Sequence, residues 1–270
     1  MKIKQLVGAL SIGFGAMAAT PAFANAVLTT PDGALSPWGG FDWEQGGTAF
    51  TTGFTGTAGD TFDMTLFAVA GALNKSPTGT FLGLKLDSNA DGISQGTGWY
   101  EYTLVAKVNE KITSCSATAC NFDVLSGTFD IYFDINPDAN STSGSLGTGY
   151  LNGVKIISGV FGAQNGGTFT TSGNGSNSTT LSGDVTYTNN AYINPDLLAT
   201  TATTTLQLGD AITGWVNPGG FNGVAFGGGP NDIVMQGDAN QNFSVVPEPA
   251  TLGLLGIALV GLGLSRRRKG

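Results

Sequence analysis

Acidic and amide side chains stand at alternate positions in the stretch LDSNADGI. Asp87, Asn89 and Asp91 are followed by Gly92, which gives the D-x-N-x-D-G pattern of the first half of a calcium-binding loop. Alternate side chains of a tight turn converge, and their oxygens are the ligands that calcium prefers. The twelfth position of such a loop would carry a bidentate acid, but here it is Gly98. The competing interpretation is an ordinary turn, because Asp, Asn and Gly are common turn residues.

A second stretch, DINPDAN, repeats the alternation with Asp134, Asn136, Asp138 and Asn140. The charge balance favours cations in general. Residues 25–246 contain eighteen Asp or Glu and five Lys but no Arg or His, a formal charge of −13. Such a surface argues against nucleic acid and against anionic lipid, which both require basic residues. The sequence therefore raises calcium as a hypothetical ligand and excludes nucleic acid as an expected partner.

Catalysis has few possible forms in this chain because it contains no histidine. Ser-His-Asp and Cys-His arrangements are impossible, and the common zinc and copper sites lose their main ligand. A carboxylate pair of the glycosidase type remains an alternative, but eighteen acids always allow such pairs to be proposed. We therefore expect a protein that is not an enzyme.

The two cysteines, Cys115 and Cys120, lie close together in SCSATACN. In an oxidising compartment such a pair is expected to form a disulfide that closes a small loop, with two free thiols as the alternative. Aromatic residues raise a carbohydrate-binding alternative, because exposed rings can stack on sugars. For Trp38, Phe41 and Trp43, however, packing in a core is the favoured interpretation.

Short runs of β-branched and aromatic residues separated by Gly, Asn and Ser predict an all-β chain. The clearest strands are YEYTLVAKVNEK (100–111) and GTFDIYFDI (127–135), each with one apolar face, and TFLGLKLD (80–87) is another candidate. We expect a single β-sandwich or jelly-roll-like domain over residues 25–246. A β-solenoid is the rival architecture, but no fixed repeat period supports it.

The first 24 residues have the anatomy of a secretory signal peptide. Lys2 and Lys4 precede an apolar stretch, and Ala22-Phe23-Ala24 forms a small-x-small site after which cleavage is expected.

The last 24 residues, 247–270, contain Pro247-Glu248-Pro249, an apolar stretch of about 15 residues expected to form a short helix, and a basic end, Arg266, Arg267, Arg268 and Lys269. The apolar stretch is short for a permanent transmembrane helix, which favours a transient inner-membrane anchor with the basic end in the cytoplasm.

This order of features closely resembles the PEP-CTERM sorting signal. The resemblance implies recognition by an exosortase, a membrane protease that cuts near the motif, and delivery to the cell surface or extracellular matrix. Members of the PEP-CTERM family are mostly non-enzymatic proteins of bacteria that make exopolysaccharide.

The body, with stretches such as FDWEQGGTAFTTGF and GDANQNFSVVPEP, is similar to the flocculation-associated group within that family. The resemblance implies a structural or adhesive component that contacts exopolysaccharide or cells in flocs or biofilm. A carboxylate-pair glycosidase and a pure carbohydrate-binding module remain the alternatives.

Overall fold

A computed structural model describes residues 26–170, 176–198, 200–209 and 215–244. The predicted signal peptide, the C-terminal helix and the sorting residues lie outside them. The described secondary structure consists of strands without α-helices, which confirms the all-β prediction. Accordingly, this part of the chain offers no helix with the length and apolar character that a membrane crossing requires.

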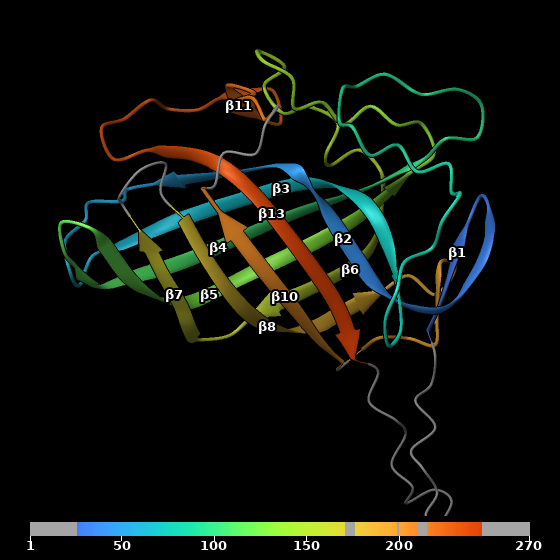
Figure 1. The fold of residues 1–270 in the computed structure, drawn as a ribbon, viewed down its shortest axis with the longest axis horizontal. Coiled ribbons are helices and arrows are strands. Elements are labelled where there is room, and N and C mark those ends of the chain that lie inside the picture. Colours follow the sequence, from blue (N-terminus) through green and yellow to red (C-terminus); the bar gives the residue numbers. More distant parts are fainter. Residues whose placement is uncertain (1–25, 171–175, 199, 210–214, 245–270) are drawn as a thin grey trace, which may run out of the picture. The chain divides into compact units, whose positions relative to one another are not determined.

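Eight long strands form one antiparallel sheet that closes on itself (Figure 1). Each strand pairs with the next, and the last pairs with the first through the contact between Asn240 and Asp42 and its neighbours. In order around the sheet they are β2 (Gly33–Thr52), β3 (Thr61–Lys75), β4 (Glu101–Cys115), β5 (Ala119–Asp134), β6 (Val154–Phe161), β8 (Ser176–Thr188), β10 (Thr201–Leu208) and β13 (Ile233–Ser244).

Five shorter strands complete the fold. β7 (Gln164–Thr170) pairs with β5 and β8, and β1 (Ala26–Thr30) pairs with β2 and with β9 (Ile193–Asn194). β11 (Gly220–Phe221) and β12 (Val224–Ala225) form a separate two-stranded sheet. The expected sandwich-like packing of apolar faces is thus achieved by facing parts of one continuous sheet.

Side chains from every long strand meet inside the closed sheet. Trp38 and Trp43 are each 1% exposed, and the Phe41 ring lies 4.9 Å from the Trp43 ring and 5.2 Å from that of Tyr102. The core prediction for Trp38, Phe41 and Trp43 is confirmed. Because successive strand residues point to opposite faces, this packing turns the alternate side chains outward.

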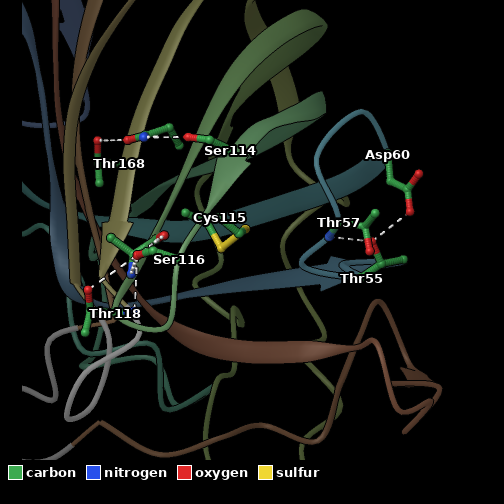
Figure 2. The surroundings of a disulfide bond; sticks show 11 residues. Thr55, Thr57, Asp60, Ser114, Cys115, Ser116, Thr118 and Thr168 are labelled. Atoms are coloured by element: carbon green, nitrogen blue, oxygen red, sulfur yellow. Dashed lines mark hydrogen bonds between the residues drawn. A yellow bond between two sulfur atoms is a disulfide. The ribbon is translucent and has the colours of Figure 1, made fainter.

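β4 and β5 form a long hairpin whose end is closed by the predicted disulfide (Figure 2). Cys115 and Cys120 are directly opposite in the register and are bonded. Beside them, Asn121 donates to Ser114 Oγ at 2.9 Å and accepts from Thr168 of β7. The disulfide joins the two strands at the hairpin end, and the hydrogen bonds of Asn121 connect that end to β7.

The outer face of β3 and β4 is covered rather than exposed. Phe67, Val105 and Tyr150 belong to a second apolar cluster, which includes residues from the connections after β5 and β10. Glu101 and Thr103 are consequently buried, at 2% and 3% exposed, although the alternation suggested a mostly polar face. Sequence periodicity identifies the two faces of a strand but not the loop that packs on one of them.

Residues 80–87 do not form the strand that their composition indicated. They make isolated bridges, Asn74 to Thr80 and Leu86 to Tyr100. Gly79 and Gly83 have φ values of 100° and 75°, and this left-handed backbone interrupts an extended strand. Leu82 is 87% exposed as a result. The segment is a loop that leads directly into the acidic stretch at Asp87.

Candidate functional site

The outward side chains of β8, β10 and β13 form a continuous polar surface, which we call the polar face. Their inward neighbours, such as Leu181, Leu206 and Ala239, are buried in the core. Hydroxyl, amide and carboxylate groups occupy the outward positions and are exposed or half-buried. The polar face comprises Thr180, Ser182, Asp184, Thr201, Thr203, Thr205, Gln207, Asp238, Asn240 and Asn242.

Strand register arranges the polar face in rows that run across the strands. One row places Ser182 opposite Thr203, and Thr203 opposite Asn242. The next row places Thr180 opposite Thr205, and Thr205 opposite Asn240. Neighbouring strands are about 4.8 Å apart, so donors and acceptors recur at a regular spacing.

Amide groups link the polar face to β2 and β3. Asn240 Oδ1 accepts hydrogen bonds from Asn74 Nδ2 at 3.2 Å and from Asn242 Nδ2 at 2.7 Å. Partial burial raises the pKa of Asp42, and the hydrogen bond from Asn240 opposes that rise. Burial also raises the pKa of Asp238, and the nearby charge of Asp42 adds to it. Because the carboxylates of Asp42 and Asp238 lie near each other, this part of the surface favours hydrogen-bond donors or cations as ligands.

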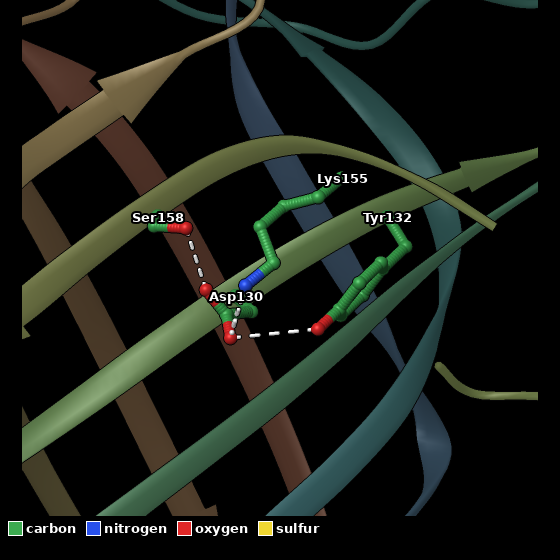
Figure 3. A network of polar contacts seen from close by, with 4 residues as sticks. All are labelled: Asp130, Tyr132, Lys155 and Ser158. Carbon is green, nitrogen blue, oxygen red and sulfur yellow. Dashed lines mark hydrogen bonds and ion pairs between the residues drawn. The ribbon is translucent and has the colours of Figure 1, made fainter. Parts of the chain in front are cut away.

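A charged cluster lies on the same outer surface, on β5 and β6 (Figure 3). Asp130 forms an ion pair with Lys155 at 2.9 Å and accepts a hydrogen bond from Ser158 Oγ at 2.6 Å. The Tyr132 hydroxyl donates to Asp130 at 3.4 Å, and the Lys155 amine lies 5.5 Å from the centre of the Tyr132 ring. The hydrogen bond to Asp130 is the main cause that raises the pKa of Lys155. These contacts hold the Tyr132 ring beside a fixed pair of charges.

Tyr187 of β8 extends this cluster toward the polar face. It lies opposite Ser158 in the register and is 43% exposed. An exposed tyrosine offers an apolar ring face and a polar hydroxyl, a combination suited to ligands with both characters. Sequence reasoning considered tryptophans and missed Tyr132 and Tyr187. Simple alternation would place Tyr187 on the same face as the buried Val185. Tyr187 is exposed because the register between β6 and β8 shifts between Ser158 and Gly159, and this shift was not visible in the sequence.

The residues of the predicted calcium loop are brought together. Asn89 Nδ2 donates to Asp91 Oδ2 at 2.9 Å, and the Ile93 NH donates to Asp91 Oδ1 at 2.8 Å. Asp87 is 4% exposed, and its Oδ1 atom has no hydrogen-bond partner. Burial, followed by the charge of Asp91, raises the pKa of Asp87, although a hydrogen bond from the Asn89 backbone opposes this.

The second acidic stretch meets a residue that the sequence did not connect to it. Oxygens of Glu101, Asp134 and Asp138 lie within 4.8 Å of one another and could together hold a metal ion. Glu101 Oε1 accepts the backbone NH groups of Asp138 and Ala139, each at 3.1 Å. Burial raises the pKa of Glu101 to about 8 despite these hydrogen bonds, with Asp138 and Asp134 adding to the rise. Both oxygens of Asp138 accept from Asn152, so this cluster is largely satisfied internally.

The C-terminal segment defines the class of protein, an exported chain that carries a sorting signal. Residues 245–269 match the family model described as the PEP-CTERM protein-sorting motif. The chain therefore carries a PEP-CTERM sorting motif, which indicates an exported protein that is sorted by an exosortase and transiently anchored in the membrane. The match contains Pro247, Glu248, Pro249 and the arginines at 266–268, which lie outside the described residues. Comparison with curated proteins and comparison with solved structures each gave no match.

Proposed function

We propose that the exported body is a non-enzymatic adhesive component of the cell surface or extracellular matrix, which binds exopolysaccharide in flocs or biofilm. The observation that carries this proposal is the polar face with Tyr132 and Tyr187 beside it. Polysaccharides present repeated hydroxyl groups, and the rows of Thr, Ser and Asn present repeated donors and acceptors. Repeated weak contacts along one polymer give an avidity that no single contact provides.

The glycosidase alternative would use the Glu101 cluster. Its carboxylates are close together, and a raised pKa near 8 is a property of general acids. Glu101 is only 2% exposed, however, and one of its oxygens is held by two backbone amides. These contacts favour a structural role, because a general acid must reach the glycosidic oxygen.

Binding to exopolysaccharide tests the proposal directly. We expect the full chain to be retained on immobilised exopolysaccharide from its own host. A variant with Tyr187→Ala and Thr205→Ala should lose at least about tenfold in retention, since several weak contacts act together. Thr97→Ala, an exposed threonine outside the sheet, is the matched control. Equal retention of the double variant and the control would contradict the role of the polar face.

Deletion of the gene tests the biological role. We expect flocculation to fall in the deletion strain and to be restored by the wild-type chain, but not by the Tyr187/Thr205 variant. Unchanged flocculation after deletion would refute the adhesive function. Restoration by a chain with Pro247 and Pro249 substituted would show that sorting through the motif is dispensable. Release of reducing sugar from exopolysaccharide by the wild-type chain would favour the glycosidase alternative.

A further inference from the structure

The loop that contains Asp87, Asn89 and Asp91 is fixed at both ends. At its start, the Asp87 NH donates to the Tyr100 carbonyl at 2.8 Å, next to the first residue of β4. At its end, Asp91 bridges to Asn140, and the Gly92 NH donates to the Ala139 carbonyl at 3.0 Å. The backbone therefore holds the three side chains over one short turn.

Asp87 is the residue whose surroundings call for a ligand. A carboxylate that is 4% exposed normally has a donor or a cation for each oxygen, because burying an unpaired charge is costly. The Asp87 carboxylate accepts a hydrogen bond from the Asn89 backbone and is close enough to Asp91 for the charge of Asp91 to raise its pKa, so it lies over the turn. Its Oδ1 atom nevertheless has no hydrogen-bond donor. Among the described residues, the ion pair found joins Lys155 to Asp130 on another part of the sheet, so it does not involve Asp87.

We propose that Asp87, Asn89 and Asp91 form a calcium site in which Asp87 Oδ1 is the buried ligand. Asp91 can contribute as well, because each of its oxygens accepts one hydrogen bond and retains a further lone pair. Asn89 Oδ1 accepts a long bond of 3.4 Å from the Asp91 NH and is available in the same way. An all-oxygen ligand set suits calcium, whereas zinc prefers nitrogen and sulfur ligands.

The neighbouring Glu101 cluster provides the internal comparison. This cluster has three carboxylates, which is more than the two of the loop at Asp87. However, Glu101 already accepts hydrogen bonds from two backbone amides, and Asp138 accepts from Asn152. Of these two groups of acids, it is the loop at Asp87 that contains a buried carboxylate oxygen without a hydrogen-bond partner. With two carboxylates and no acid at the twelfth position, the site belongs to the weak extracellular class, with a Kd of about 0.1–1 mM.

Calorimetric titration of the full chain with CaCl2, after removal of divalent ions with EGTA, tests the site. We expect about one ion per chain, weaker binding of MgCl2, and a rise in Tm of about 3–6 °C at 10 mM CaCl2. Asp87→Asn should weaken calcium binding at least about tenfold, and Asp91→Asn provides a second variant if Asp87→Asn does not fold. Asp134→Asn, at the end of β5, is the matched control and should retain the wild-type affinity.

Three results would overturn the proposal. The first is the absence of both heat and a Tm shift in the wild-type chain at 10 mM CaCl2. The second is loss of binding in Asp134→Asn with retention in Asp87→Asn, which would place the ion at the Glu101 cluster. The third is unchanged binding in all three variants. Because these measurements contain no polysaccharide, their outcome is independent of the proposed adhesive function.

Discussion

Two glutamates of strand β4 are buried about 30 Å apart along the strand and have different surroundings. Glu101 points out of the closed sheet, lies under the loop that follows β5, and accepts two backbone NH groups. Glu110 points inward and lines a small cavity of about 20 Å³ whose other walls are mostly apolar, including Phe62, Phe122 and Met235. Burial raises the pKa of both to about 8, but only Glu101 has hydrogen-bond donors that oppose the rise. One buried acid therefore organises a loop, whereas the other is a net cost to stability when ionised.

The largest effect is expected from Glu110→Gln at alkaline pH. The folded pKa of Glu110, about 8, exceeds its ordinary value of 4.5, so the folded chain holds a proton that the unfolded chain has released. Stability attributable to Glu110 is complete below pH 4.5 and is lost as the pH rises to 8. At pH 9 the glutamine variant should be more stable than the wild type by about 5 kcal/mol, and equal to it near pH 4. Urea unfolding of both proteins at both pH values measures this, and a stability difference between them that is the same at pH 4 and pH 9 would contradict it.

Replacement of Glu101 should have the opposite sign. Glu101→Leu leaves the NH groups of Asp138 and Ala139 without their acceptor, which should destabilise the fold by about 3 kcal/mol at pH 7. Glu101→Gln keeps an acceptor oxygen and is the matched control. Glu110→Leu should be neutral or stabilising in the same urea experiment. If both leucine variants are equally destabilised, the distinction between the two glutamates is wrong.

Removal of the disulfide probes the stability of the hairpin end near Glu110. Converting both Cys115 and Cys120 to serine should cost about 2 kcal/mol, because the closed loop is short and the strands are already paired. The Tm of the variant without reductant, compared with that of the wild type with and without reductant, measures the cost. A reduced wild type that keeps its full Tm would show that the bond contributes nothing to stability.

The smallest effect is expected from Asn152→Ala. Asn152 donates to both oxygens of Asp138, but the contact is exposed. Its loss should cost only about 0.5 kcal/mol, since a single exposed polar contact contributes little. A cost above 2 kcal/mol would mean that the loop over Glu101 depends on Asn152 rather than on the glutamate.

The sequence was sufficient to predict features that depend on local patterns. Alternation in residues 100–111 and 127–135 identified the central hairpin, and the spacing of Cys115 and Cys120 identified the disulfide. The tail from Pro247 onward identified the sorting signal, which the family match confirms.

Features that depend on pairing between distant strands could not be predicted. Nothing local to β13 indicates that it joins β2 and closes the sheet, about 190 residues away in the chain. The burial of Glu101 depends on a loop that begins more than 30 residues later. The polar face was missed for the same reason, because its rows exist only once Thr205 is placed between Thr180 and Asn240.

Closure of the sheet through β13 and β2 also limits how copies of this protein can associate. An open sheet ends in strands whose free NH and carbonyl groups invite another chain to add a strand, the route to fibres. Here each of the eight long strands has a neighbour on both sides. The sheet also continues from β2 through β1 to β9, and this last strand is only two residues long. Among the described residues, this closure leaves little strand edge to which another chain could add. In the proposed adhesive role, contacts between copies would therefore form through side chains on the faces of the sheet.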